Sequence, residues 1–291
     1  MASSTSSNNS FSIYRTSIEQ VMRGQERLPS LPTITLKIRR AAADPNTTIQ
    51  NLSDMIGQDP SLTVVVMHHS RSPLFKTRTE AKSLEDAIRL MGIPYVVNLV
   101  MIHSLKSLFL VQNPGLKALF AISWKRQALK ASMSRFLAVK LGMQTPDEAF
   151  ISSLLSEVGT LAILSALSET RQVPDQVAYL RLCRAYSKSL AVIILKKWDM
   201  DSRYVEIARG CGEWQQVKST DNSPLTTLDI VNLSLYHSVS LLKRDHSLPA
   251  LTNLDCYQRL PASLAQLSKN GLLQLVMSNL KEIVDSAQTL H

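Results

Sequence analysis

Hydrophobic positions recur with helical spacing along most of this chain. One helical face in the first half is formed by Ile49, Leu52, Met55 and Ile56. A longer apolar stripe in the second half is formed by Leu129, Met133, Phe136, Leu137 and Leu141. No stretch combines a sustained period of two with turn signals, which is the pattern of a half-buried strand. The sequence therefore predicts an all-α protein.

Capping signals mark where several helices begin. Thr47 and Gln50 have capping-box spacing, and Ser83 and Asp86 repeat it. Asp59-Pro60 pairs an N-cap residue with a proline in the first helical position. These signals and the apolar periodicity predict helices that include residues 11–23, 33–43, 84–91, 161–168, 174–185, 187–198, 202–209, 224–244 and 270–289.

Composition narrows the class of protein. The chain has 291 residues, 45% of them hydrophobic, so it can fill a core, and its 9 glycines and 5% aromatic residues argue against a β-sandwich or a glycine-rich phosphate loop. Cys183, Cys211 and Cys256 form no CxxC pair, so we expect buried thiols in a reducing cytoplasm. The polar N-terminus lacks the features of a signal peptide, and polar residues interrupt the most apolar stretch, 96–111, so no membrane span is expected.

The net charge of +9, from 32 basic and 23 acidic residues, raises the question of nucleic-acid binding. The basic residues are dispersed over different segments, and no recognition motif is present. We interpret the excess as a solvated basic surface, and a nucleic-acid partner is not expected.

Short motifs occur in a particular order along the chain. Leu28 to Pro32 reads LPSLP, Asp44-Pro45 follows, Ile56 to Pro60 reads IGQDP, and Ser83 to Gly92 reads SLEDAIRLMG. In this order and spacing they resemble the HDOD family, the HD-related output domains of bacterial signalling proteins. The resemblance extends over residues 28–243. It implies an N-terminal helical subdomain packed on a second half that is similar to the HD phosphohydrolase fold.

HD phosphohydrolases hold a divalent metal with a histidine, an adjacent His-Asp pair and a distal aspartate. Leu154 to Gly159 resembles the His-Asp turn, with Ser156 and Glu157 in place of the ligands. The resemblance also aligns ligand positions with Arg126, Ser187, Cys211, Gly212 and Asn232. A guanidinium has no lone pair to donate, and only Glu157 and Cys211 could ligate an ion. We therefore expect a degenerate metal site, with no cofactor, metal or catalytic residue.

Histidines outside that motif are expected to be structural. Adjacent helical residues point about 100° apart, so His68 and His69 are unlikely partners for one ion, and we expect one half-buried and one exposed side chain. His103 is expected to be a hydrogen-bonded core residue, and His237 to pack or to lie at the surface. Trp214 stands in an expected loop, where an interface role stays open.

Two pairs of acids, Glu85-Asp86 and Asp147-Glu148, resemble acid–base pairs. Both pairs fall in first helical turns, where the helix dipole favours negative charge. Helix capping is therefore the better interpretation of both.

The function expected from these observations is that of a non-catalytic bacterial signal-transduction module in the cytoplasm. It would bind a protein partner, such as a sensor kinase or a cyclic-dinucleotide enzyme. A divergent phosphohydrolase rebuilt around Glu157 and Cys211 remains an alternative, as does a basic surface that binds nucleotide or nucleic acid. The expected organisation is a disordered tail (1–10), an N-terminal helical subdomain (11–115), an HD-like subdomain (116–245) and a helical extension (246–291).

Overall fold

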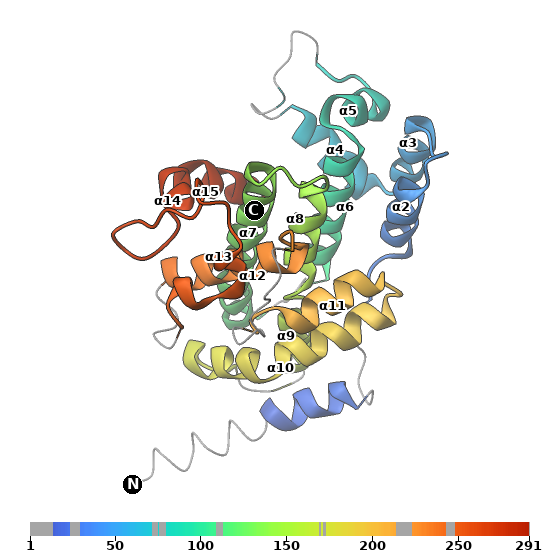
Figure 1. The fold of residues 1–291 in the computed structure, drawn as a ribbon. Helices are drawn as coiled ribbons and strands as arrows, with labels where there is room; N and C mark the ends of the chain where they lie inside the picture. The colour runs from blue at the N-terminus through green and yellow to red at the C-terminus, as the bar shows by residue number, and fades with distance from the viewer. Residues whose placement is uncertain are drawn as a thin grey trace. The chain divides into compact units, whose positions relative to one another are not determined.

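The computed structural model describes residues 14–23, 30–71, 75, 80–108, 113–168, 170, 173–213, 223–242 and 248–290. Over these residues the chain is helical, with no β-strand beyond one isolated bridge between Leu267 and Leu273 (Figure 1). The predicted all-α class is confirmed. The chain divides into two compact units, Ser30–Leu110 and a larger unit that joins Met1–Pro29 to Val111–His291.

The smaller unit is built from helices α2 (Thr33–Ala43), α3 (Ile49–Gly57), α4 (Pro60–Ser70), α5 (Leu84–Met91) and α6 (Ile93–Ser107). Their apolar faces meet in one core, to which each helix contributes buried aliphatic side chains: Ile38, Leu52, Ile56, Leu62, Val66, Ile88, Leu99 and Val100. The periodic positions of the sequence are thus the positions that the fold buries.

Helix caps in the smaller unit follow the sequence signals closely. Ser83 and Asp86 form the predicted capping box at the start of α5, and the Asp59 carboxylate caps α4. At α3 the capping box is formed by Thr48 and Asn51, one residue later than predicted. Thr48 has the extended backbone and Asn51 the side-chain reach that the motif requires, so the neighbouring pair was the wrong choice.

The larger unit begins with a helix at residues 14–22, which the sequence had placed with the N-terminal subdomain. Tyr14, Ile18 and Val21 are buried along one face of this helix. Burial and then the charge of Asp175 raise the pKa of Tyr14. The apolar face of the helix therefore explains its grouping with the larger unit.

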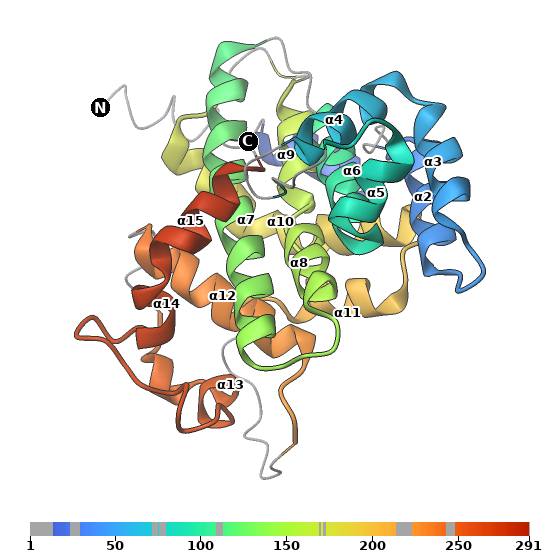
Figure 2. The same ribbon diagram turned by 90° about the horizontal axis from the view of Figure 1, so that it is seen from above.

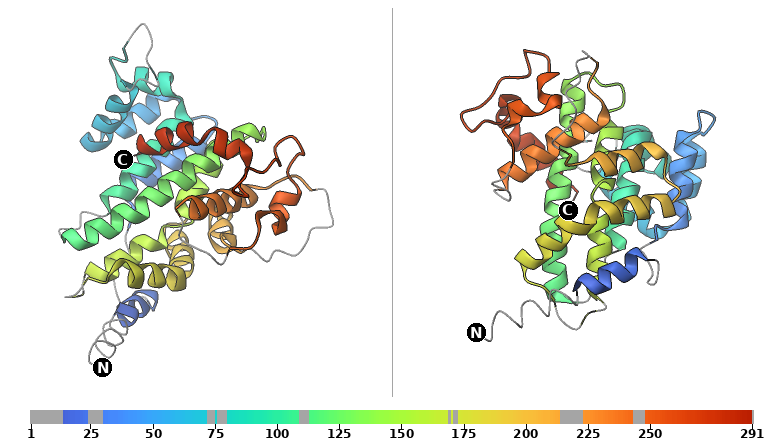
Figure 3. Two further views of the ribbon diagram at one scale, coloured as in Figure 1. Left: turned by 90° about the vertical axis from the view of Figure 1, so that its left-hand side faces the viewer. Right: turned by 60° about the horizontal axis from the view of Figure 1, so that its bottom comes forward.

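The centre of the larger unit is α7 (Pro114–Lys140), followed by α8 (Pro146–Leu155), α9 (Gly159–Ser168), α10 (Gln176–Lys197), α11 (Ser202–Gly210) and α12 (Thr227–Leu241). The prediction of separate helices at 174–185 and 187–198 was wrong, because α10 is continuous. Its sequence contains neither proline nor glycine, so nothing interrupts the backbone hydrogen bonds at Ser187. Helices α10 and α11 lie side by side, as Figure 3 shows.

The C-terminal segment contains η2 (Leu251–Asn253), α13 (Asp255–Gln258), α14 (Gln274–Ser278) and α15 (Leu280–Gln288). One helix had been predicted over 270–289. It is interrupted at Asn279, where φ is −113° and ψ is 16° and the side-chain amide donates to the Leu275 carbonyl. Helix α15 lies along α7, as Figure 2 shows.

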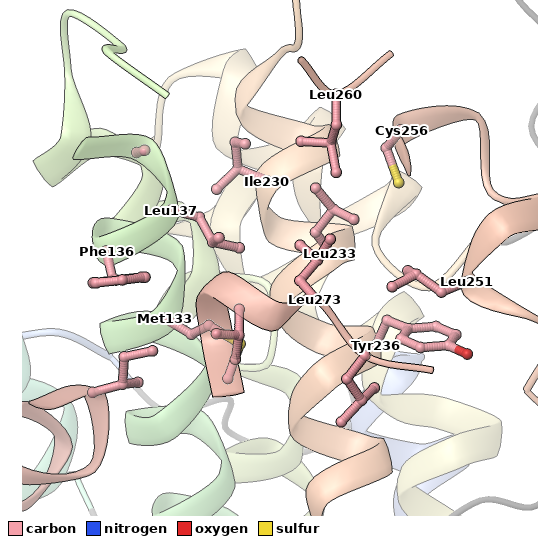
Figure 4. Packing of buried hydrophobic residues seen from close by; sticks show 14 of the residues in the cluster. Met133, Phe136, Leu137, Ile230, Leu233, Tyr236, Leu251, Cys256, Leu260 and Leu273 are labelled. Atoms are coloured by element: carbon pink, nitrogen blue, oxygen red, sulfur yellow. The ribbon is translucent and has the colours of Figure 1, made fainter. Parts of the chain in front are cut away.

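An apolar cluster joins α7 and α12 to this C-terminal segment (Figure 4). It includes Met133, Phe136, Leu137, Ile230, Leu233, Tyr236, Leu251, Leu260 and Leu273. Polar contacts add to the apolar ones. The indole of Trp124 donates to the Leu290 carbonyl at 3.2 Å, and the Leu273 amide donates to Nε2 of His237 at 3.0 Å. The segment is therefore an integral layer of the larger unit.

One part of the described chain, Pro146–Ser168, is long and apolar enough to cross a membrane by length and composition alone. Within this structure 94% of its most apolar window is buried, and it consists of α8, a turn and α9. Core helices of water-soluble proteins meet the same criterion, so this is weak evidence for a span.

Candidate functional site

The turn between α8 and α9 carries Ser156 and Glu157, and its neighbours fix its position. Leu154 and Leu155 before it are buried. After it, Gly159 begins α9 against the backbone of α10, where an added Cβ would lie 1.8 Å from the Ser187 carbonyl oxygen. Only glycine allows this approach. The shape of the turn therefore depends on its buried apolar start and its final glycine.

Glu157 is almost fully buried, at 7% exposure, and faces two cations from α7. Nη2 of Arg126 donates to its Oε2, and Nζ of Lys130 lies 3.0 Å from its Oε1. Burial would raise the pKa of Glu157, but the charges of Arg126 and then Lys130 outweigh this effect and lower it to about 2. Glu157 is therefore a carboxylate whose charge the protein itself compensates.

Lys130 is the residue that the sequence reasoning missed. Its side chain is fully buried, and Nζ donates to Ser156 Oγ at 2.7 Å. It also lies 3.7 Å from Cys211 Sγ, a hydrogen-bond distance for sulfur. The available signal was a lysine one helical turn after Arg126, between the apolar residues of the predicted stripe. Three positions aligned with metal ligands, Ser156, Glu157 and Cys211, thus surround one ammonium group. A fourth, Arg126, pairs with Glu157.

Gln127 fastens the same turn to α7. Its Nε2 donates to Thr160 Oγ1 at 2.7 Å, and Thr160 Oγ1 in turn donates to the Glu157 carbonyl oxygen at 2.8 Å. Gln127 and Thr160 are both buried. The carboxylate of Glu157 is therefore held on a backbone that side-chain hydrogen bonds make rigid.

Gly212 and Asn232 are also brought together, in a clamp at the end of α11. The Gly212 amide donates to Asn232 Oδ1 at 2.8 Å, and Asn232 Nδ2 donates to the Gly210 carbonyl at 3.4 Å. Gly212 has φ +80°, the left-handed region that favours glycine. Both residues thus shape the turn that carries Cys211, which explains their residue types without a bound ligand.

Ser187 contacts the α8–α9 turn through its backbone, unlike the other positions aligned with metal ligands. Its side chain is half-buried, and its carbonyl oxygen forms the close contact with Gly159. Nearby, the hydroxyl groups of Tyr179 on α10 and Ser123 on α7 are 2.6 Å apart. Burial raises the pKa of the Cys183 thiol, also on α10, to about 11. This side of the cluster is therefore neutral.

Other candidates have structural roles in the described residues. His68 is exposed and His69 half-buried, as expected. His237 is fully buried, with Nδ1 donating to the Leu233 carbonyl at 2.7 Å, so it packs inside the larger unit. His103 is only half-buried, against the expectation of a core position, because it points to Ser61 Oγ, 3.3 Å away at a helix start. Trp214 lies outside the described residues.

The candidate acids cap helices and form ion pairs. Asp86 belongs to the capping box of α5, and Glu85 pairs with Arg89. In the first turn of α8, Asp147 pairs with Arg135, and Glu148 pairs with Arg203.

Asp229 is the carboxylate nearest in sequence to the position expected for the distal metal ligand, and it has structural partners. Asp229 forms a capping box with Thr226 at the start of α12 and pairs with Arg259 at 2.6 Å. Arg259 also pairs with Asp255, so it joins α13 to α12.

The donor set at the α8–α9 turn does not suit a divalent metal. It offers one carboxylate and one thiol, and both face cationic side chains. In the part of the chain that the structure describes, no group of three or more His, Cys, Asp or Glu residues is placed to hold a metal ion. Structural and catalytic zinc sites use three or four such protein ligands.

Comparisons with known proteins place this fold. A family model for the HDOD domain matches residues 28–210. No curated protein gives a significant match. Among solved structures, an HDOD domain protein of unknown function from Geobacter sulfurreducens is 18% identical, with a TM-score of 0.66, over 95% of this chain and 97% of that one.

Two further crystal structures are similar. A protein from Shewanella amazonensis, provisionally named a metal-dependent phosphohydrolase, is 17% identical with a TM-score of 0.65, over 94% of this chain and 98% of that one. A protein from Marinobacter aquaeolei, provisionally named a signal transduction protein, is 19% identical with a TM-score of 0.59, over 96% of this chain and 64% of that one. At these identities the structures support the fold alone. Since the family model covers most of the chain and the helices agree with it, this protein belongs to the HDOD family.

Proposed function

We propose that this protein is a non-catalytic regulatory module of bacterial signal transduction, which acts by binding another protein after losing the HD metal site. The observation that carries the proposal is the Arg126–Glu157–Lys130 cluster. Two fixed cations neutralise the remaining carboxylate at the place where a hydrolase needs free metal ligands. Family membership supports a regulatory role, and the name of the Marinobacter relative agrees with it.

The loss of metal chemistry can be tested on the purified chain. We expect no stoichiometric divalent metal after dialysis against buffer that contains Mn²⁺, and no metal-dependent hydrolysis of bis-(p-nitrophenyl) phosphate, nucleotides or cyclic dinucleotides. A divergent phosphohydrolase would instead show metal-dependent turnover that disappears in Glu157→Gln. Turnover of that kind would overturn the proposal.

Helix α10 is the surface that we propose for the partner. It carries Arg181, Arg184, Lys188, Lys196 and Lys197 and no acidic residue. Arg181 and Arg184 are exposed, whereas Lys188 pairs with Glu213. Val177, at 61% exposure, lies one turn before Arg181 on the same side. A basic helix face of this kind complements an acidic surface on the partner.

The partner experiment uses charge reversal on this face. Proteins captured by the tagged chain are purified, and binding is measured again with both components pure. We expect Arg181→Glu/Arg184→Glu to weaken binding roughly tenfold and to reverse its salt dependence. Lys117→Glu, an exposed basic position near the start of α7, is the matched control. Equal binding by both variants would exclude α10, and binding to duplex DNA in preference to protein would favour a nucleic-acid function.

The compartment that fits this proposal is the cytoplasm. None of the three cysteines is paired in a disulfide, and all three are buried. Buried free thiols suit a reducing compartment.

A further inference from the structure

Groups from two separate turns converge on one nitrogen atom in the larger unit. Ser156 Oγ and Glu157 Oε1, both from the α8–α9 turn, lie 2.7 and 3.0 Å from Lys130 Nζ. Cys211 Sγ, just after α11, lies 3.7 Å from it. The HDOD resemblance aligns all three residues with metal-ligand positions. The atom on which they converge belongs to the chain itself.

We propose that the ammonium group of Lys130 is the resident cation of this site and takes the place of the divalent metal of HD phosphohydrolases. The inference extends the proposed loss of the metal site by naming what replaced the ion. It concerns how the core is held together, so it can fail or stand independently of any partner.

The hydrogen-bonding capacity of the groups supports this assignment. An ammonium group has three N–H donors and no lone pair. Its three neighbours here are a carboxylate, a hydroxyl and a thiol, all of which can accept. Ser156 Oγ gives its own proton to the Ser153 carbonyl at 2.8 Å, which leaves its lone pairs for Lys130. The ammonium therefore donates hydrogen bonds to Ser156 Oγ and Cys211 Sγ, and the Glu157 carboxylate is its ion-pair partner at 3.0 Å.

The positive charge at this site also equals that of a divalent metal ion. Lys130 and Arg126 together bring two positive charges to Glu157, the charge of one divalent ion. Lys130 is fully buried, and a buried charge is stable only with close compensation, which Glu157 supplies. A divalent ion placed among the same groups would meet the ammonium within a few ångströms and be repelled. The ammonium group of Lys130 thus pairs with Glu157 and excludes a divalent ion from the same place.

Replacing the ammonium with a metal-binding group tests this directly. In Lys130→His an imidazole stands where the ammonium was, beside Glu157 and Cys211, which makes three zinc ligands. We expect this variant to take up one zinc ion per chain and to gain thermal stability when ZnCl₂ is added. The wild-type protein is expected to do neither. Lys130→His/Glu157→Gln should lose most of the zinc uptake.

The control is Lys125→His, at an exposed position on the same helix. A folded Lys130→His variant that takes up no more zinc than this control would overturn the proposal. So would stoichiometric divalent metal in the wild-type protein that Glu157→Gln removes. Hydrolysis by a metal bound elsewhere would instead contradict the proposed function and leave the assignment of Lys130 intact.

A measurement on the wild-type protein keeps the inference testable if Lys130→His does not fold. Lysine ammonium protons that are buried and hydrogen-bonded exchange slowly with water. We expect one slowly exchanging lysine ammonium signal in the ¹H–¹⁵N spectrum of the side-chain region, which Lys130→Arg removes. Absence of such a signal from the folded wild-type protein would overturn the proposal.

Discussion

Gly159 and Ser187 bring helices α9 and α10 into direct backbone contact. A Cβ atom on Gly159 would lie 1.8 Å from the Ser187 carbonyl oxygen and 2.7 Å from the Ala191 amide nitrogen. Both obstacles are backbone atoms, which cannot move aside as a flexible side chain can. The final glycine of the Leu154–Gly159 motif is therefore a packing requirement, independent of metal chemistry.

Gly159→Ala should consequently destabilise the larger unit by about 3 kcal/mol or more, because α9 must move away from α10. The measurement is urea unfolding followed by circular dichroism. Gly57→Ala is the matched control, since its added Cβ would meet only Leu84 Cδ1 at an ordinary 3.7 Å. Similar losses in the two variants would contradict the contact between α9 and α10.

Glu157→Gln should cost about 3–5 kcal/mol of unfolding free energy, because it leaves Arg126 and Lys130 without their buried counter-charge. The comparison is Asp147→Asn, which removes a more exposed pair with Arg135 and should cost less than about 1 kcal/mol. Chemical unfolding at neutral pH measures both. A loss at Glu157 no larger than at Asp147 would mean that the charge cluster adds little to stability.

The charge cluster should also persist into strong acid. Because the folded-state pKa of Glu157 is about 2, below its ordinary value of 4.5, its contribution is present above about pH 4.5 and is lost as pH falls toward 2. The difference in unfolding free energy between wild-type protein and Glu157→Gln should therefore hardly change between neutral pH and about pH 5. A difference that stays constant between about pH 4.5 and about pH 2 would instead place the carboxyl pKa near its ordinary value.

His237 should make stability depend on pH in a higher range. Burial of the ring lowers its pKa from 6.5 to about 4. The Leu273 amide donates to Nε2, which accepts only when the ring is neutral. The unfolded chain takes up a proton below about pH 6.5 while the folded chain does not, so stability falls by up to about 1.4 kcal/mol per pH unit until about pH 4. Urea unfolding at about pH 7 and about pH 5 should show this slope in the wild-type protein and a smaller one in His237→Gln.

Asn232→Ala should destabilise the turn after α11 by about 1–3 kcal/mol, since the Gly212 amide and the Gly210 carbonyl both lose their side-chain partner. Asn253→Ala, at an exposed asparagine, should be near neutral. Hydrogen exchange at the Gly212 amide gives a local readout. Unchanged protection there in Asn232→Ala would show that the clamp is not formed in solution.

Much of the secondary structure could be predicted from local sequence. The caps at Asp59 and Ser83 depend on contacts within three residues, so their motifs were sufficient. The errors at Thr48, at the continuous α10 and at Asn279 occurred where two neighbouring choices had similar local preferences. Side-chain hydrogen bonds decided the first and the last, and α10 continues because it contains neither proline nor glycine.

At the candidate site, too, some features could be predicted from the sequence and others needed the structure. The residue types at Arg126, Ser156 and Glu157 predict that metal ligands are missing, because this prediction needs only the chemistry of each side chain. Lys130 could not be assigned from its position in an apolar stripe. A lysine there is expected to extend toward water, and only its neighbours in space show that it is buried and paired.

The sequence by itself therefore determined the helical class and the family, and it predicts the replacement of the expected ligands. These follow from periodicity, motif order and side-chain chemistry, which are properties of short stretches. The tertiary structure alone decided that Ser156, Glu157 and Cys211 gather around Lys130. They come from distant parts of the chain, and their meeting depends on how α7, α8 and α11 pack, which no local pattern specifies.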